Sequence, residues 1–219
     1  MQLDKLVRKY RPKVALDIDG TIADTHAPIL EEWNRIKGKN FKHSDIDDYD
    51  WEKTKLQMPI EEFFRIYKKA WTENFTSIPP TITEQELNHL IKHFDVDIVT
   101  RRPSDAKPTL EKWLSYNFPT SRLRIITVEH TLDKLKSGHE IIIDDAPQIW
   151  AAFSRRDPST EGKWLYAPRQ PWNEKTISSM PASSRMTVAD TASDTLRLAL
   201  DGRGCDCKTA LKKPLRAFQ

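Results

Sequence analysis

Five short apolar runs along the chain predict the strands of a buried sheet. Four of them are rich in β-branched residues, and Trp and Tyr mark the fifth. The runs span residues 13–19, 96–100, 123–128, 140–144 and 163–166. Between them, helical spacing of apolar residues recurs within residues 83–91, 110–114 and 146–153. Strands that alternate with helices favour a parallel sheet covered on both faces, so we predict a Rossmann-like α/β fold.

The segment from about residue 25 to residue 80, after the first predicted strand, breaks this alternation. It holds two helix-like stretches, residues 29–33 and 60–67, with a polar loop between them. We interpret this segment as a small helical cap inserted after the first strand. The predicted division is a core of residues 1–24 and 81–200, a cap of residues 25–80, and a flexible basic tail of residues 201–219.

Composition narrows the class of protein. The chain has 219 residues and a net charge of only +3, too little to indicate nucleic acid or a membrane surface as the main partner. No apolar run approaches the roughly 20 residues that a helix needs to span a bilayer. The two cysteines, Cys205 and Cys207, exclude a disulfide scaffold and favour a reducing compartment. We therefore expect a cytoplasmic protein that acts on a small molecule.

Four acidic residues lie at the ends of two predicted strands. Asp17 and Asp19 close the first strand, and Asp144 and Asp145 close the fourth. Sites in parallel α/β sheets form beyond the carboxyl ends of the strands, so these side chains are expected to converge on one rim. Because Asp17 and Asp19 are two residues apart, both should point to the same side of an extended strand. Such an oxygen-rich pocket suits Mg²⁺, and all four acids are predicted metal ligands.

Two further side chains are expected at the same rim. Thr100 ends the second predicted strand, and Lys134 lies in the segment that leads to the fourth. A hydroxyl and an ammonium group are both donors that can bind phosphate oxygens. Lys136 lies only two residues from Lys134 and could take its place, so the choice between the two lysines stays open.

Taken in order, these motifs resemble those of the haloacid dehalogenase-like superfamily. The resemblance covers residues 13–149. It rests on the segment from Asp17 to Thr21, followed by Thr100, Lys134 and the pair Asp144 and Asp145. The spacing from Lys134 to Asp144 is more similar to that of the family than the spacing from Lys136, which favours Lys134 as the phosphate-binding lysine.

The resemblance implies a role for each residue. Asp17 would attack phosphorus, and Asp19 would protonate the leaving oxygen and then activate water against the aspartyl-phosphate. Thr100 and Lys134 would bind the phosphoryl oxygens, and the last pair of acids would hold Mg²⁺. The hydrolytic dehalogenases of the superfamily lack the second acid, so Asp19 favours phosphate chemistry.

Elementary acid–base chemistry agrees with these roles. A carboxylate with a reference pKa of about 3.9 is ionised at neutral pH, so Asp17 needs no separate base. An alkoxide is a poor leaving group and requires a proton donor, which Asp19 can be if its pKa is raised.

Three local segments carry a closer resemblance, to the 5′(3′)-deoxyribonucleotidase group. They are residues 100–103, 143–147 and 167–173. The resemblance implies a nucleoside monophosphate substrate beneath a cap whose aromatic side chains could stack on the base. Arg101 is a further phosphate-binding candidate. The candidates for the remaining substrate contacts are Phe41, Tyr49 and Trp51 in or beside the cap loop, and Trp172 and Asn173 after the fifth strand.

The sequence therefore predicts a Mg²⁺-dependent phosphomonoester hydrolase of the 5′(3′)-(deoxy)ribonucleotidase type. Two alternatives stay open. One is a phosphatase with the same mechanism that acts on another small metabolite, because fold and motifs do not set the substrate. The other is a nucleotide-binding module without turnover. Intact Asp17 and Asp19 argue against the second alternative, because binding alone needs neither a nucleophile nor an acid.

Overall fold

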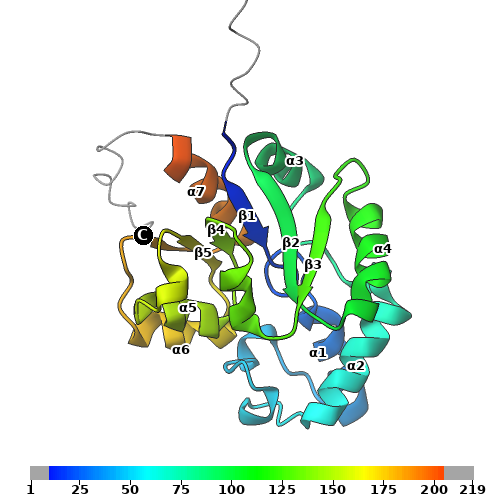
Figure 1. The fold of residues 1–219 in the computed structure, drawn as a ribbon. Helices are drawn as coiled ribbons and strands as arrows, with labels where there is room; N and C mark the ends of the chain where they lie inside the picture. The colour runs from blue at the N-terminus through cyan, green and yellow to red at the C-terminus, as the bar shows by residue number, and fades with distance from the viewer. Residues whose placement is uncertain (1–9, 205–219) are drawn as a thin grey trace, which may run out of the picture.

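The computed structural model describes residues 10–204, which form a parallel sheet of six strands surrounded by helices (Figure 1). The strands are β1 (Lys13–Leu16), β2 (Asp95–Arg101), β3 (Arg124–Val128), β4 (Ile141–Ile143), β5 (Trp164–Pro168) and β6 (Met186–Ala189). Their order across the sheet is β3-β2-β1-β4-β5-β6, and each neighbouring pair is parallel. The predicted α/β fold and its five strands are confirmed, whereas β6 is an edge strand that the sequence pattern did not reveal.

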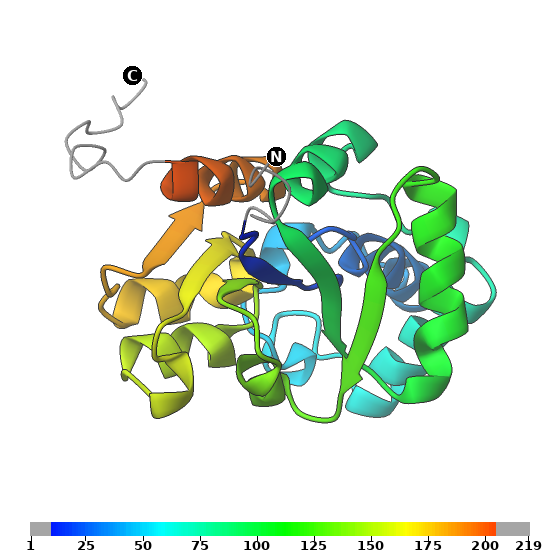
Figure 2. The same cartoon turned by 45° about the horizontal axis from the view of Figure 1, so that its top comes forward.

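Alternating side chains bury both faces of the sheet. On β1, Val14 and Leu16 belong to one apolar cluster and Ala15 belongs to another. The first cluster is covered by α3 (Glu84–His93), α4 (Lys107–Asn117) and α7 (Ala192–Gly204). The second is covered by α5 (Pro147–Ser154), α6 (Pro171–Ser179) and the 3₁₀ turn η5 (Thr131–Lys136). Figure 2 shows α7 and α3 on one side of the sheet and α5 on the other. Burial on both faces explains why the strands read as continuous apolar runs.

Local signals set where the predicted helices begin. The Thr83 hydroxyl accepts from the Glu86 amide and the Glu86 carboxylate accepts from the Thr83 amide, so the capping box forms at the start of α3. The predicted helical stretches at residues 110–114 and 146–153 lie in α4 and α5. Both of these helices carry a proline in their first turn, where its missing N–H has no consequence.

The segment between β1 and α3 forms a helical layer beyond the carboxyl ends of β1 and β2 (Figure 1). It consists of α1 (His26–Lys37), η1 (His43–Asp45), η2 (Trp51–Lys53), α2 (Ile60–Thr72) and η3 (Phe75–Ser77). Trp33, Met58 and Ile66 lie in an apolar cluster that belongs mostly to this segment. Trp172 joins that cluster and Trp71 of α2 joins the main core, so the two parts share side chains. The division of the chain at residues 25–80 stays a prediction.

At its carboxyl end, α7 continues to Gly204, so the first residues of the predicted tail are helical. The rest of that tail, residues 205–219, lies outside the described residues. Among the helices between residues 10 and 204, none has the length and apolar character to cross a membrane.

A tight turn after β1 positions the first two acids. The Ile18 carbonyl accepts from the amides of Thr21, Ile22 and Ala23, and the Gly20 amide donates to the Ala23 carbonyl. Gly20 has a φ of +71°, a conformation that residues with a Cβ rarely adopt. A Cβ at this position would overlap the Asp145 carboxylate and lie 2.8 Å from Cζ2 of Trp172. Glycine is therefore required here both by backbone conformation and by close packing.

We predict that Gly20→Ala destabilises the protein by roughly 2–4 kcal/mol, because strain at positive φ adds to a clash with a buried carboxylate. Gly38→Ala is the matched control, since Gly38 has a φ of +59° but no atom within 4 Å of the place that a Cβ would occupy. The control should lose only about 1 kcal/mol. Urea unfolding of both variants measures the difference, and equal losses would show that the packing around Gly20 is not tight.

Candidate active site

The predicted acids meet between β1 and β4, where the order of the strands across the sheet reverses. β1 and β4 are neighbours in space, but β2 and β3 extend from β1 to one side while β5 and β6 extend from β4 to the other. Ligands in open α/β sheets bind at this kind of switch point. Asp17 follows β1, and Asp144 and Asp145 follow β4, so the topology brings these three acids together.

Lys134 lies between two of these carboxylates. Its Nζ is 2.9 Å from Oδ2 of Asp17 and 2.7 Å from Oδ2 of Asp144, and all three side chains are buried. The other oxygen of Asp144 accepts from the Ala146 amide at 2.9 Å. Lys136 instead pairs with Asp133 on the surface. Of the two lysines that the sequence left open, the structure therefore brings Lys134 to the acids.

The cluster holds more negative than positive charge in a buried place. Burial raises the pKa of Asp17 to about 7, with Lys134 opposing the shift and Asp144 and Asp19 adding to it. Burial and the charges of Asp144 and Asp17 raise the pKa of Asp145 well above its usual value. Burial acts to lower the pKa of Lys134, but its two carboxylate partners outweigh this effect and raise it. These shifts show that one lysine does not neutralise the site.

A divalent cation fits this excess of negative charge. Ligand atoms from Asp17, Asp144 and Asp145 all lie within 4.8 Å of one another. Oδ1 of Asp17 is buried and has no hydrogen-bond partner, which is the kind of atom that a bound cation satisfies. Carboxylate oxygens are the ligands that Mg²⁺ prefers. Asp19, which the sequence also predicted as a ligand, is not part of this group.

Asp19 takes different partners from Asp17, although the two are only two residues apart. Its carboxylate accepts hydrogen bonds from Arg102, from the Tyr67 hydroxyl at 3.0 Å and from the Thr25 hydroxyl. Burial acts to raise the pKa of Asp19, but the Arg102 charge and the hydrogen bonds outweigh it, so the pKa is lowered. In this arrangement Asp19 is an ionised carboxylate.

Arg102 is a site residue that the sequence analysis missed. The predicted Arg101 is exposed at the end of β2, whereas Arg102 is buried between Asp19 and the ring of Trp71, 3.8 Å from the ring centre. Thr100 is also buried and lies two residues before Arg102. It lies two residues after Ile98, which pairs with Leu16 of β1. The sequence held a signal for Arg102, because side chains two residues apart in a strand point to the same side. Arg102, and not Arg101, is two residues from Thr100.

Trp172 and Asn173 form hydrogen bonds with Asp145. The Trp172 indole N–H donates to Oδ2 of Asp145 at 2.7 Å. The side-chain amide of Asn173 donates to the backbone carbonyls of Asp145 and Pro168. Both side chains are buried. These contacts fix the position of Asp145, whereas the predicted contact of Trp172 and Asn173 with substrate stays a prediction.

The three cap aromatics differ in exposure. Trp51 is buried in the apolar cluster of the cap segment, and Phe41 is partly buried against that cluster. Tyr49 exposes 41% of its surface, and surrounding protein atoms together with Asp145 raise its pKa. Tyr49 is therefore the one of the three that is open to solvent, and its pKa also responds to the charge of Asp145.

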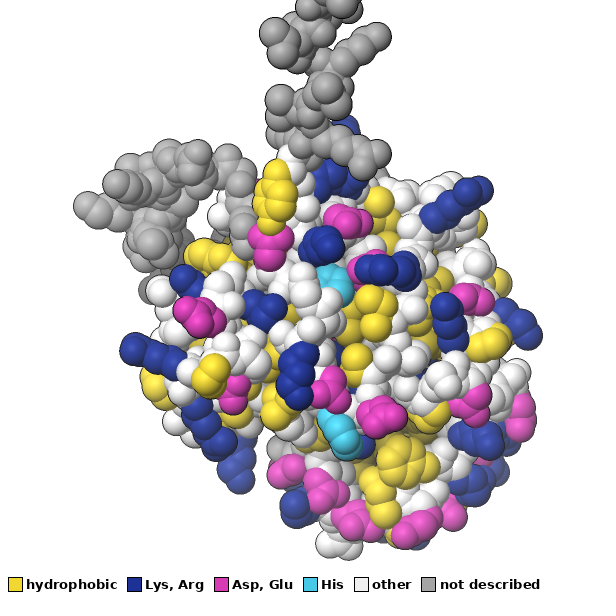
Figure 3. Space-filling model, viewed as in Figure 1, with side chains coloured by type: hydrophobic (Ala, Val, Ile, Leu, Met, Phe, Trp, Pro, Cys, Tyr) yellow, Lys and Arg dark blue, Asp and Glu magenta, His cyan; other side chains and the backbone are white. Residues whose placement is uncertain are grey.

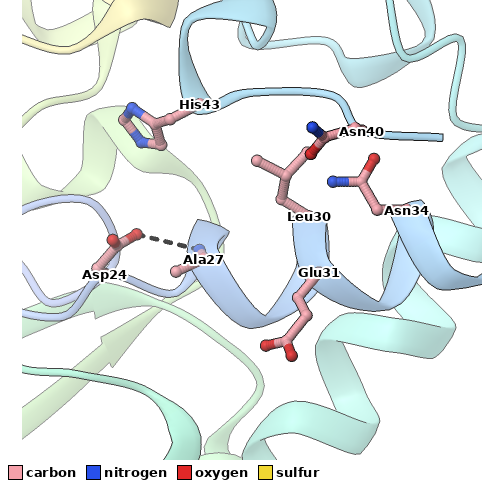
Figure 4. Close-up of a pocket in the computed structure, with 7 residues that line it drawn as sticks. All are labelled: Asp24, Ala27, Leu30, Glu31, Asn34, Asn40 and His43. Carbon is pink, nitrogen blue, oxygen red and sulfur yellow. Dashed lines mark hydrogen bonds between the residues drawn. The ribbon is translucent and has the colours of Figure 1, made fainter.

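A cavity of about 490 Å³ lies on the cap, separate from the acid cluster. Figure 4 shows it between α1 and the segment that carries Asn40 and His43, with Asp24 and Glu31 among its polar lining. The lining includes two acids and no lysine or arginine, so it does not suit a phosphate group. His43, in the cavity lining, packs edge-on against Trp172 with 5.4 Å between ring centres, and Trp172 in turn donates to Asp145.

We predict that Asp145→Asn stabilises the metal-free protein at pH 8 by roughly 2–6 °C in melting temperature, because it removes one of several crowded negative charges. The pKa values of Asp17 and Asp145 are higher in the folded protein than in the unfolded chain. The folded state therefore binds more protons, and wild-type stability should fall as pH rises from about 4 to about 7. The variant should lose less stability over this range.

Differential scanning fluorimetry in EDTA and in Mg²⁺ tests this prediction. Mg²⁺ should stabilise the wild type at pH 8 and have little effect on the variant. Asp105→Asn, at an exposed site, is the control and should behave like the wild type. An equal Mg²⁺ response in Asp145→Asn would exclude this carboxylate from the metal site.

No protein-family model matches the chain, and no curated protein matches it in sequence. Solved structures do resemble it. A protein of Burkholderia xenovorans LB400 described as a haloacid dehalogenase-like hydrolase is 17% identical, with a TM-score of 0.54 over 88% of this chain and 98% of that one. A hydrolase of Pseudomonas syringae is 16% identical, with a TM-score of 0.51 over 89% and 99% of the two chains.

A third structure, a protein of Bacteroides fragilis described as a haloacid dehalogenase-like hydrolase, is 14% identical, with a TM-score of 0.50 over 82% and 97% of the two chains. None of the three is described as a nucleotidase. At these identities the likeness concerns architecture alone. The chain has the fold of the haloacid dehalogenase-like hydrolases.

Proposed function

We propose that this protein is a Mg²⁺-dependent phosphomonoester hydrolase that forms an aspartyl-phosphate on Asp17 and acts on nucleoside monophosphates. The observation that carries the proposal is the buried cluster in which Lys134 faces Asp17 and Asp144 beside Asp145. A structural ion pair would need only one carboxylate. One lysine beside three carboxylates leaves an excess of negative charge, which favours the binding of a cation. A cation next to a lysine is in turn suited to bind phosphate.

In the proposed reaction Asp17 is the nucleophile. A carboxylate oxygen attacks phosphorus, the bond to the leaving oxygen breaks, and water then hydrolyses the acyl phosphate. The Lys134 ammonium group, 2.9 Å from Asp17, would bind a phosphoryl oxygen, and the Thr100 hydroxyl would be a second donor. Mg²⁺ held by Asp17, Asp144 and Asp145 would supply positive charge that offsets repulsion between the carboxylate and the phosphate.

We assign the two proton transfers to Asp19. When protonated it can donate to the leaving oxygen, and when ionised it can accept a proton from the water that attacks the acyl phosphate. Arg102 and Tyr67 favour the ionised form. The described arrangement therefore supports the second transfer most directly. For the first transfer, the Asp19 carboxylate must exchange one of its present partners for the leaving oxygen.

The substrate class rests on the nucleotidase-like segments and on Tyr49. Tyr49 is exposed and its pKa responds to the charge of Asp145, so we propose that its ring lies against a base whose phosphate is at the acids. On the face shown in Figure 3, acidic and basic side chains lie interspersed and do not gather by sign. Together with the net charge of +3, this favours a small substrate over a polyanion.

We predict that Asp17→Asn lowers Mg²⁺-dependent phosphatase activity at least roughly a thousandfold, because an amide is not a nucleophile toward phosphorus. Steady-state assays with 4-nitrophenyl phosphate measure the loss, and circular dichroism checks that the variant is folded. The exposed control Asp105→Asn should keep wild-type rates. Turnover by Asp17→Asn within tenfold of the wild type would rule out the covalent mechanism.

The substrate assignment predicts selectivity within a panel of phosphate esters. With Mg²⁺, 5′- and 3′-nucleoside monophosphates should exceed glucose 6-phosphate at least roughly tenfold in kcat/KM, and EDTA should abolish all activity. Tyr49→Leu should lower kcat/KM for nucleotides by roughly 5- to 100-fold, in line with the loss of one stacked base. The same variant should leave 4-nitrophenyl phosphate nearly unaffected. Equal rates across the panel would reject the nucleotidase and leave a phosphatase for another metabolite.

A further inference from the structure

A chain of hydrogen bonds runs from the backbone of Lys134 through the buried side chains of His139 and Asp97. The Ser137 hydroxyl donates to the carbonyl of Lys134 at 2.5 Å and lies 2.7 Å from Nδ1 of His139. Nε2 of His139 lies 2.9 Å from Oδ2 of Asp97 on β2. Arg124, at the start of β3, donates to the other oxygen of Asp97 at 2.9 Å. The chain therefore connects two strands of the sheet with the backbone of the lysine.

Each member of this chain has a fixed partner. The Ser137 hydroxyl donates to the Lys134 carbonyl. The His139 ring bridges Ser137 and Asp97 through its two nitrogens. Burial acts to raise the pKa of Asp97, but its partners Arg124 and His139 outweigh burial and lower it, so Asp97 is an ionised acceptor.

Ser137, His139 and Asp97 are the residue types of a hydrolytic triad, but the geometry does not suit nucleophilic catalysis. In such a triad the histidine accepts the proton of the serine, whereas here the hydroxyl proton is directed to a carbonyl. His139 and Asp97 are 1% and 5% exposed. Neither of the two surface cavities described for residues 10–204 is lined by any of the three residues.

These hydrogen bonds hold the turn that carries Lys134. Lys134 lies in η5, a short 3₁₀ turn, and the amide of Ser137 also donates to the Lys134 carbonyl, at 3.3 Å. A turn of this type has poorer hydrogen-bond geometry than an α-helix and gains little rigidity of its own. The Lys163 ammonium group donates to the His139 carbonyl at 2.7 Å and fixes the far side of the same loop. The turn that carries Lys134 is therefore held by side chains of β2 and by residues beside β4 and β5.

We propose that Ser137 and His139, anchored on Asp97, are positioning residues that hold Lys134 where it binds the phosphoryl group of the substrate. The proposal rests on the phosphate-binding role of Lys134 in the proposed function. A charged group that must meet a small anion loses affinity when it moves by a fraction of an ångström, so its support is part of the site. Neither Ser137 nor His139 touches the substrate in this proposal.

Ser137→Ala tests the proposal with the smallest change, because it removes one hydroxyl and leaves the buried His139–Asp97 pair in place. We expect the inhibition constant of inorganic phosphate, measured with Mg²⁺ and 4-nitrophenyl phosphate, to rise roughly five- to tenfold. Ser137→Thr keeps a hydroxyl and should restore most of the affinity. Ser154→Ala is the matched control, because Ser154 also donates to a backbone carbonyl, that of Pro181, at a remote site. It should change the constant less than twofold.

A double-mutant cycle separates positioning from a general loss of structure. Lys134→Ala should weaken phosphate binding more than Ser137→Ala does. When Lys134 is already absent, adding Ser137→Ala should weaken binding less than twofold further, because the serine acts through the lysine. Additive losses would overturn the proposal and assign Ser137 a merely structural role. Unchanged phosphate affinity in Ser137→Ala, beside a large loss in Lys134→Ala, would overturn this inference and leave the proposed function standing.

If Lys134→Ala itself binds phosphate as well as the wild type, the phosphate-binding role of Lys134 fails, and the inference fails with it.

Discussion

The rest of the site depends on one buried ammonium group. Three carboxylates meet at the switch point of the sheet because β1 and β4 are neighbours there, and their mutual repulsion opposes folding. Lys134 reduces that repulsion by contacting two of them at once. In the proposed function its charge has a second role, because the remaining negative charge favours a cation and the ammonium group favours an anionic substrate. The charge of Lys134 would therefore serve both the stability of the fold and the proposed chemistry.

The cap segment contributes to the electrostatics of the second acid. Tyr67 and Trp71 both lie on α2, where Tyr67 donates to Asp19 and Trp71 packs against the Arg102 guanidinium. Arg102 in turn binds Asp19 through its side-chain nitrogens. The ionised state of Asp19 is thus set by groups from both the core and the segment inserted between β1 and β2. A change in how α2 packs on the core would change the proton affinity of Asp19.

The sequence predicted five of the six described strands and missed the edge strand β6. Apolar runs revealed β1 to β5 because those strands are buried or long enough to stand out, whereas β6 is a four-residue edge strand whose middle residues are only partly buried. The capping box located the start of α3 because its hydrogen bonds are local. The sequence also predicted that Asp17, Lys134, Asp144 and Asp145 would converge, since chain order and strand polarity set which ends meet.

By itself, the sequence determined the fold class, the position of the acids at strand ends and the candidate lysines, because periodicity and strand polarity are properties of the chain. Only the tertiary structure brought Lys134 and not Lys136 to the acids, Arg102 to Asp19, and the Trp172 indole to Asp145. These outcomes depend on contacts between residues 27 to 83 positions apart, or on which side of a short turn faces the core. No local pattern records such contacts, because their energies arise only when the separate strands and the cap are packed together.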